Sequence, residues 1–131
     1  MEKEKRKEMK IVIPVDEKME SSNVCVVFAR TPYFGVYNTE NNSFDFIDNT
    51  ATESSSGAGI KAAQLLVDEG ADVLLTPRCG ENSEEVLKAA EIKIYKTEKE
   101  KNAMENIKMY IDGQLNELTE FHGGFHGRGV K

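Results

Sequence analysis

The stretch that decides the fold runs from Gly57 to Tyr95 and reads GAGIKAAQLLVDEGADVLLTPRCGENSEEVLKAAEIKIY. Residues 57–69 carry polar side chains on one helical face and apolar side chains on the other, which predicts an amphipathic helix that the next glycine ends. The apolar run 71–76 predicts a buried strand, Ser83 is the expected start of a second helix, and 93–95 predicts another strand. Strands that alternate with helices are typical of a parallel α/β unit with right-handed crossovers. The polar face holds Lys61, Gln64 and Asp68, and the apolar face holds Ile60, Ala63, Leu66 and Val67.

The first half of the chain is predicted to be a meander of short strands. Lys10 to Val15 is an apolar run that suits a strand buried on both faces. Val24 to Phe28 is a second apolar run, which we also expect to be a strand. Tyr33–Asn38 and Ser43–Ile47 flank the polar turn 39–42, as the two strands of a hairpin do.

A last helix is predicted near the end of the chain. Thr97 and Glu100 have the spacing of a capping box, and apolar residues then recur at helical intervals as far as Gly113. These recurring residues are Ala103, Met104, Ile107, Tyr110 and Ile111. A strand meander followed by strands that alternate with helices predicts an α/β fold, a single domain with a mixed sheet flanked by helices.

Length, charge and cysteine usage restrict the classes of function. At 131 residues the chain fits one domain, placed at 9–118 between a charged extension, 1–8, and a glycine- and histidine-rich tail, 119–131. The formal net charge of -6 and the sequence pI of about 5.0 argue against nucleic-acid binding, which usually rests on a basic surface. No segment approaches the length of a membrane span. Cys25 and Cys79, without a secretion signal, indicate a reducing cytoplasm.

Five motifs share their order and spacing with a known family. They are KIVIPVD at 10–16, FARTPYF at 28–34, YNTE at 37–40, SGAGIKAA at 56–63 and LKAAEIKIY at 87–95. With these motifs the chain, from Met9 to Ile111, resembles the dinitrogenase iron-molybdenum cofactor biosynthesis proteins of the NifX and NifB C-terminal type. The resemblance implies a ribonuclease H-like fold and a role as a carrier or chaperone of a metal cluster.

In an open α/β sheet, binding sites lie outside the carboxyl ends of the parallel strands. Three segments are expected there: 16–23, 54–59 and 77–83. In the second segment, Ser56, Gly57 and Gly59 surround a helix start, where backbone N–H groups and the positive end of the helix dipole can hold an anionic metal cluster. The alternative is a flexible loop with a serine N-cap.

Cys79, which Gly80 follows, is the leading candidate for a metal ligand. It lies between a strand end and a helix start, a position that lowers the pKa of a thiol and makes a soft thiolate ligand available. The alternative is a small loop residue without chemistry. Cys25 lies in the predicted strand 24–28, where a cysteine is usually just a buried hydrophobic residue.

Arg30 and the two histidines complete the candidate site. Arg30 matches the arginine of a family motif in which Ala29 replaces the usual glycine, and its planar guanidinium could pair with an anionic cluster. The alternative for Arg30 is a structural salt bridge. His122 and His126 could ligate a metal, because histidine is the commonest metal-binding side chain near neutral pH. Their alternative is a disordered tail with incidental histidines.

The resemblance favours a non-enzymatic carrier that binds an iron-sulfur or iron-molybdenum-type cluster, or a precursor, and hands it to a partner protein. In this hypothesis the helix start and Arg30 offset the charge of the cluster, while Cys79 and the histidines supply labile ligands. One alternative is a metal-free domain that binds a protein partner. Another is a metal-dependent nuclease with Asp16 as a metal-binding carboxylate, although the acidic surface would repel nucleic acid.

Overall fold

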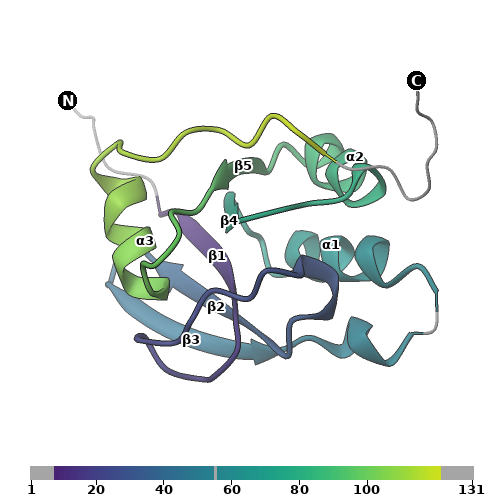
Figure 1. Ribbon diagram of the computed structural model, residues 1–131, viewed down its shortest axis with the longest axis horizontal. Coiled ribbons are helices and arrows are strands. Elements are labelled where there is room, and N and C mark those ends of the chain that lie inside the picture. Colours follow the sequence, from purple (N-terminus) through teal and green to yellow (C-terminus); the bar gives the residue numbers. More distant parts are fainter. Residues whose placement is uncertain (1–7, 55, 122–131) are drawn as a thin grey trace.

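A computed structural model describes residues 8–54 and 56–121 of the chain. In that part of the chain, five strands form one sheet with the order β3-β2-β1-β4-β5, and helices flank it (Figure 1). The strands are β1 (Lys10–Val15), β2 (Tyr33–Asn38), β3 (Ser43–Asp48), β4 (Val73–Thr76) and β5 (Lys93–Lys96). The α-helices are α1 (Ala58–Asp68), α2 (Glu81–Ala89) and α3 (Ala103–Ile111), and the 3-10 helices are η1 (Phe28–Arg30) and η2 (Thr50–Glu53).

The sheet is mixed, as the sequence predicted. β1 pairs antiparallel with β2, which pairs antiparallel with β3. On its other side β1 pairs parallel with β4, which pairs parallel with β5. β1 is therefore the central strand, and both of its edges are occupied. Its residues from Ile11 to Val15 are all buried, which explains the uninterrupted apolar run.

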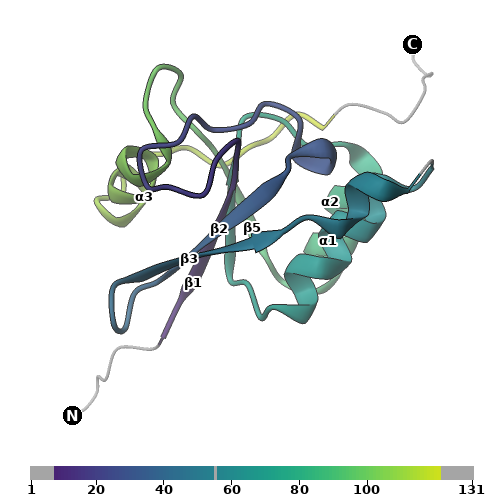
Figure 2. The ribbon, with the colours of Figure 1, turned by 90° about the horizontal axis from the view of Figure 1, so that it is seen from below.

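Helices cover the two faces of the sheet differently (Figure 2). α1 and α2 pack on one face, and α3 lies on the other. Alternate residues of β1 point to opposite faces and separate two hydrophobic clusters. Val12 belongs to the cluster beneath α1 and α2, here called the α1/α2 cluster, whereas Ile11 and Ile13 belong to the α3 cluster. The predicted α/β fold with a mixed sheet flanked by helices is confirmed.

The predicted strand at 24–28 is wrong. Val24 makes a single antiparallel bridge to Val15, after which the chain turns into η1. β2 pairs along the whole of β1 on one side and β4 pairs with Ile11 and Val12 on the other, so this apolar run reaches only the far end of β1. Cys25 is accordingly half-buried outside any strand.

The start of α2 and one face of α1 also differ from expectation. Gly80 rather than Ser83 precedes the helical turn of α2, and Ser83 is buried within that first turn. On α1, Ile60 was placed on the buried face but is 45% exposed, whereas Ala62 is fully buried. The buried face of α1 is thus made of smaller side chains than predicted, and this lets α2 approach closely.

The capping box of α3 lies later than predicted. The Asn102 side chain accepts from the Glu105 N–H, and the Glu105 side chain accepts from the Asn102 N–H, both at 2.8 Å. The predicted pair, Thr97 and Glu100, does not start the helix. Glu100 has a φ of +68°, which is outside the helical region.

After α3 the chain returns across the molecule as a strap, residues 114–121 (Figure 1). Two backbone hydrogen bonds of 2.8 and 2.9 Å tie this strap to the outer edge of β5. Leu118 is buried, and Phe121, the last described residue, packs against the α1/α2 cluster. The strap therefore carries the chain from the α3 side of the molecule to the α1/α2 side.

Candidate functional site

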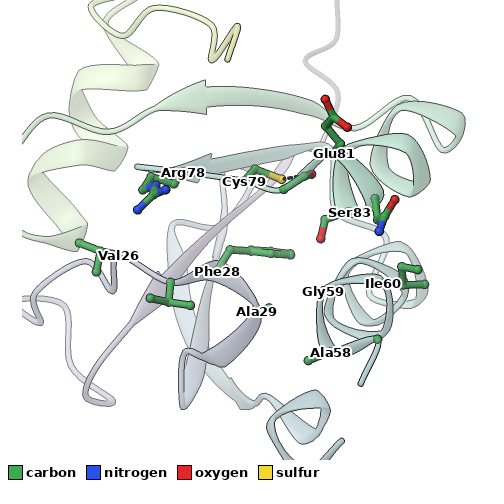
Figure 3. A pocket seen from close by; sticks show the side chains of 14 residues that line it. Val26, Phe28, Ala29, Ala58, Gly59, Ile60, Arg78, Cys79, Glu81 and Ser83 are labelled. Carbon is green, nitrogen blue, oxygen red and sulfur yellow. Dashed lines mark hydrogen bonds between the residues drawn. The ribbon is translucent and has the colours of Figure 1, made fainter. Parts of the chain in front are cut away.

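A pocket of about 400 Å³ opens beyond the carboxyl end of β4, between the starts of α1 and α2 (Figure 3). Three segments of the chain line it. Residues 26–29 lead into η1, 57–60 begin α1, and 78–83 form the loop after β4 and the first turn of α2. The pocket lies where the topology of an open α/β sheet places binding sites.

Two glycines shape the start of α1. Gly57 is the N-cap and has a φ of +70°, a left-handed conformation that favours glycine. Gly59 faces α2 so closely that a Cβ at this position would lie 2.5 Å from Ser83 Oγ. Figure 3 shows Ser83 directed toward Gly59 across the helix contact. These glycines allow the tight turn and the close packing that put two helix starts side by side.

The start of α2 has the same chemical character as the start of α1. Its N-cap is Gly80, in extended conformation. Neither α1 nor α2 has a hydrogen bond from an N-cap side chain to its first turn. A glycine N-cap has no side-chain oxygen to accept from the first N–H groups of its helix. Both helices therefore direct donors and the positive ends of their dipoles toward the pocket, which suits an anion.

Cys79 belongs to the pocket wall but is only 1% exposed. It packs in the α1/α2 cluster, and its thiol donates to the carbonyl oxygen of Gly80 at 3.6 Å. Burial, and secondarily the negative charge of Glu84, raise the pKa of the Cys79 thiol from 9.0 to about 12. The prediction that its position lowers the thiol pKa is wrong, because desolvation outweighs the effect of the helix start.

The structure does not bring Arg30 into the pocket wall. Its guanidinium donates to the backbone carbonyls of Thr52 and Ser54, at 3.3 and 3.1 Å, and so ties η1 to the segment that leads into α1. The exposed cation that does line the pocket is Arg78. Sequence reasoning missed Arg78, although its position between the end of β4 and Cys79 was a usable signal.

Three segments were predicted to converge outside the carboxyl ends of the parallel strands. Two of them, 54–59 and 77–83, contribute residues to the pocket wall. Segment 16–23 instead packs on the start of α3, where its carbonyl groups accept hydrogen bonds of 3.0 Å from the first two N–H groups of that helix. Asp16, at the beginning of this segment, is exposed. Residues 26–29 take the third position and bring Val26 and Val27 to the mouth of the pocket.

The remaining predicted site residues are placed as follows. Ser56 is exposed, does not line the pocket and is not the N-cap, so the alternative of a serine cap is wrong. Gly57, Gly59 and Gly80 all line the pocket. His122 and His126 lie outside the described residues.

Two features are absent from the described residues, 8–54 and 56–121. No group of three or more His, Cys, Asp or Glu side chains there is arranged to hold a metal ion. No helix in the same residues is long and apolar enough to span a membrane.

Comparison with known proteins gives a consistent result for fold and family. A family profile described as dinitrogenase iron-molybdenum cofactor matches residues 9–113. The apo form of the orange protein from Desulfovibrio gigas superposes with a TM-score of 0.80 at 29% identity, covering 84% of this chain and 92% of that protein. A Thermotoga protein described as a candidate NifB protein of the DUF35 family has a TM-score of 0.75 at 37% identity, covering 86% of this chain and 96% of that one. No curated protein matches the chain.

Proposed function

The chain belongs to the dinitrogenase iron-molybdenum cofactor family, and from this premise we propose that it carries an anionic metal-sulfur cluster in the pocket between α1 and α2. The cargo is an iron-sulfur or iron-molybdenum-type cluster, or a precursor of one, which the protein passes to a partner protein. In this role the protein itself performs no catalysis.

The observation that carries the proposal is the pairing of two helix starts, both with glycine N-caps, at one pocket. Metal-sulfur clusters with several sulfide ligands are anions, and the first N–H groups of α1 and α2 offer donors to such ligands without using side chains. Arg78 adds a positive charge at the same pocket and opposes the negative charge of Glu81 there. Arg30 contributes indirectly, because its bonds to the carbonyls of Thr52 and Ser54 brace the segment before α1.

Cys79 fits a labile ligand better than a permanent one. A metal binds the thiolate, so it must displace the proton of a thiol whose pKa is raised to about 12. Displacing this proton at neutral pH lowers the apparent affinity, and a carrier must release its cargo. The helix starts therefore supply most of the attraction for the anionic cluster, and Cys79 has a secondary role.

Gly80→Asp tests the role of the helix starts. The φ and ψ of Gly80 suit an aspartate N-cap, so the new carboxylate would cap α2 and place a negative charge at the pocket. After anaerobic incubation with iron-sulfur or molybdenum-sulfur clusters and desalting, the parent protein should retain metal, whereas this variant should lose it without losing thermal stability.

Ser21→Asp is the matched control, because it adds the same charge at an exposed position on the segment that packs against α3. Equal metal retention by Gly80→Asp and the parent protein would contradict the proposal. So would the absence of retained metal in the parent protein.

Cys79→Ser separates ligation from charge attraction. If Cys79 ligates the cargo as a thiolate, the affinity of the parent protein should rise by up to about tenfold per pH unit below the thiol pKa, and this slope should vanish in the variant. Absorbance titrations at several pH values measure the slope. The same pH slope in both proteins would remove Cys79 from the ligand set.

A further inference from the structure

Ser83 carries a buried hydroxyl that forms no hydrogen bond to the described part of the chain. Seven polar residues are buried within residues 8–54 and 56–121, and most of them are paired through their side chains. The paired ones are Ser22, Thr31, Asn49, Thr76 and Asn106. The side chains of Ser83 and Thr97, which are 4% and 6% exposed, have no partner among these described residues. Because an unpaired buried hydroxyl is costly, proteins keep few of them, and each calls for an explanation.

Of these two hydroxyls, the one of Ser83 lies at the pocket. Ser83 is the third residue of α2 and lines the pocket wall, whereas Thr97 does not. A serine in a helix can donate to a carbonyl in the preceding turn. The carbonyl of Gly80 has both of its lone pairs in use, because it accepts from the Cys79 thiol at 3.6 Å and from the Glu84 N–H at 2.9 Å. The Ser83 hydroxyl is therefore available to a molecule in the pocket.

Gly59 leaves the space that this hydroxyl occupies. A Cβ on Gly59 would lie 2.5 Å from Ser83 Oγ and 3.8 Å from the Cβ of Ala29, so α1, α2 and η1 meet at this point. Figure 3 shows Ser83 between the first turns of α2 and α1. The first backbone hydrogen bond of α1 is donated by the Lys61 N–H, so the N–H groups of residues 58–60 lie ahead of it. An acceptor atom that reaches Ser83 Oγ would therefore also lie near these donors.

We propose that Ser83 Oγ donates a hydrogen bond to a terminal oxo or sulfido atom of the anion that the pocket binds. This inference rests on the proposed function and deepens it, because it assigns a side chain to the recognition of the same cargo. Terminal oxo and sulfido atoms have lone pairs and no proton, so they accept hydrogen bonds and cannot donate them. An anion with such an atom at this point satisfies the hydroxyl, whereas an anion without one leaves it buried and unpaired. Ser83 is thus a specificity-determining residue.

Ser83→Ala tests this role, because it should weaken binding without weakening the fold. Loss of a hydrogen bond to a charged acceptor should raise the Kd by about tenfold to a hundredfold. Calorimetric titrations measure the Kd for two probes, molybdate and tetrathiomolybdate, which are both tetrahedral dianions and differ in their terminal atoms. The urea midpoint of the unliganded variant should not fall, because the variant no longer buries an unpaired hydroxyl.

Thr97→Val is the matched control. It removes the other buried hydroxyl that has no described partner, at a position outside the pocket and with little change in volume. Its Kd for both probes should equal that of the parent protein. A loss of binding as large as the loss in Ser83→Ala would overturn the proposal, because the effect would then not depend on a donor at the pocket.

Two results with Ser83→Ala would overturn the role of Ser83. One is an unchanged Kd for every probe that the parent protein binds. The other is weaker binding together with a lower urea midpoint, because Ser83 would then act by holding the two helices together. A parent protein that binds neither probe would overturn the role as well.

Cluster retention after desalting separates this inference from the proposed function. If the parent protein and Ser83→Ala retain clusters equally, the carrier function stands and the role of Ser83 fails. If the parent protein retains no cluster but binds molybdate more tightly than Ser83→Ala does, the proposed cargo fails and the hydrogen bond from Ser83 to an anion stands.

Discussion

The start of α3 and the starts of α1 and α2 are built in opposite ways. At α3 the carbonyl groups of Glu20 and Ser22 accept from the first two N–H groups. The side chains of Asn102 and Glu105 complete the cap. At α1 and α2 a glycine occupies the N-cap, and the pocket lies in front of both helices. The start of the helix that only covers the sheet is closed by its capping box and by carbonyls of segment 16–23, whereas the two helices at the pocket leave donors for a ligand.

This difference shows how a small acidic protein can bind an anion without a basic patch. Glycine N-caps make positive helix ends available, and a buried thiol adds a ligand only when a metal displaces its proton. The stability that caps would have contributed to α1 and α2 is given up at the place where binding is proposed, as is common at functional sites. The following changes test this contrast, from the largest expected effect to the smallest.

Gly59→Ala should destabilise the protein, although alanine is the better helix former. The new Cβ would lie 2.5 Å from Ser83 Oγ in the contact between α1 and α2, and overpacking of this kind costs about 1–3 kcal/mol. The free energy of unfolding from urea titrations measures the effect. In a Ser83→Ala background the same change should be neutral or stabilising, because the clashing oxygen is gone. Stabilisation by Gly59→Ala alone would mean that the helices are not this close.

Alkaline pH should weaken the fold through Cys79. Its folded pKa of about 12 lies above the unfolded value of 9.0, so the stability it contributes is fully present below pH 9 and is lost as the pH rises toward 12. The loss accumulates at about 1.4 kcal/mol per pH unit in this window.

Urea titrations between pH 8 and 11 should show a shallower decline for Cys79→Ala than for the parent protein. Tyr110→Phe, on the α3 side, should also make the decline shallower, because burial raises the pKa of the Tyr110 phenol, as do the charges of Tyr95 and Asp72. If neither substitution changes the decline in unfolding free energy, Cys79 and Tyr110 are not the source of the alkaline instability.

Asn102→Ala should cost about 1 kcal/mol of stability, because it removes the side-chain acceptor of the capping box on α3. Thermal unfolding measures the loss. Metal retention should be unaffected, since α3 lies on the opposite face of the sheet from α1 and α2 (Figure 2), whose starts line the pocket. A loss of retention as large as that expected for Gly80→Asp would remove the distinction between the two kinds of helix start.

Ser56→Ala should change the unfolding free energy by less than about 0.5 kcal/mol, because Ser56 is exposed and is not the N-cap of α1. The same urea titrations serve as the measurement. A cost near that of Asn102→Ala would show that α1 is capped by a side chain after all.

The elements that local pattern specifies were predictable from the sequence. The strand at 10–15, the hairpin around residues 39–42, the helix before Gly70 and the strand at 93–95 all have a clear period or a turn signal. The apolar run at 24–28 shares the composition of a strand but makes only a single bridge, from Val24 to Val15, because β2 and β4 pair with the rest of β1. Whether an edge is free is a property of the whole sheet and cannot be read from the run itself.

The choice between two possible capping boxes also depended on distant contacts. Both Thr97 with Glu100 and Asn102 with Glu105 have the required spacing. The fully buried Asn106 decides between them, because its side chain bonds to the backbone of residues 98, 101 and 102 and holds this loop outside the helix. A pattern of local residues does not contain this information.

The candidate site was predictable in part. Gly57 and Gly59 were recognised from their position at a predicted helix start, and Gly80 as the neighbour of Cys79, and all three line the pocket. The acidity of Cys79 was misjudged because burial under neighbouring elements, and not local position, sets its pKa. The exposed apolar side chains at the pocket were missed, because Val26 and Val27 lie more than thirty residues away from Ile60 in the chain.

The strap on β5 has a consequence for assembly. A sheet can be extended by another molecule only where a strand exposes unpaired N–H and C=O groups, and this strap hydrogen-bonds to the outer edge of β5. Association by strand pairing is thereby directed to the β3 edge. Among the residues that the structure describes, two copies joined there would leave no further strand edge open, so such pairing ends at a dimer and does not propagate into a fibre.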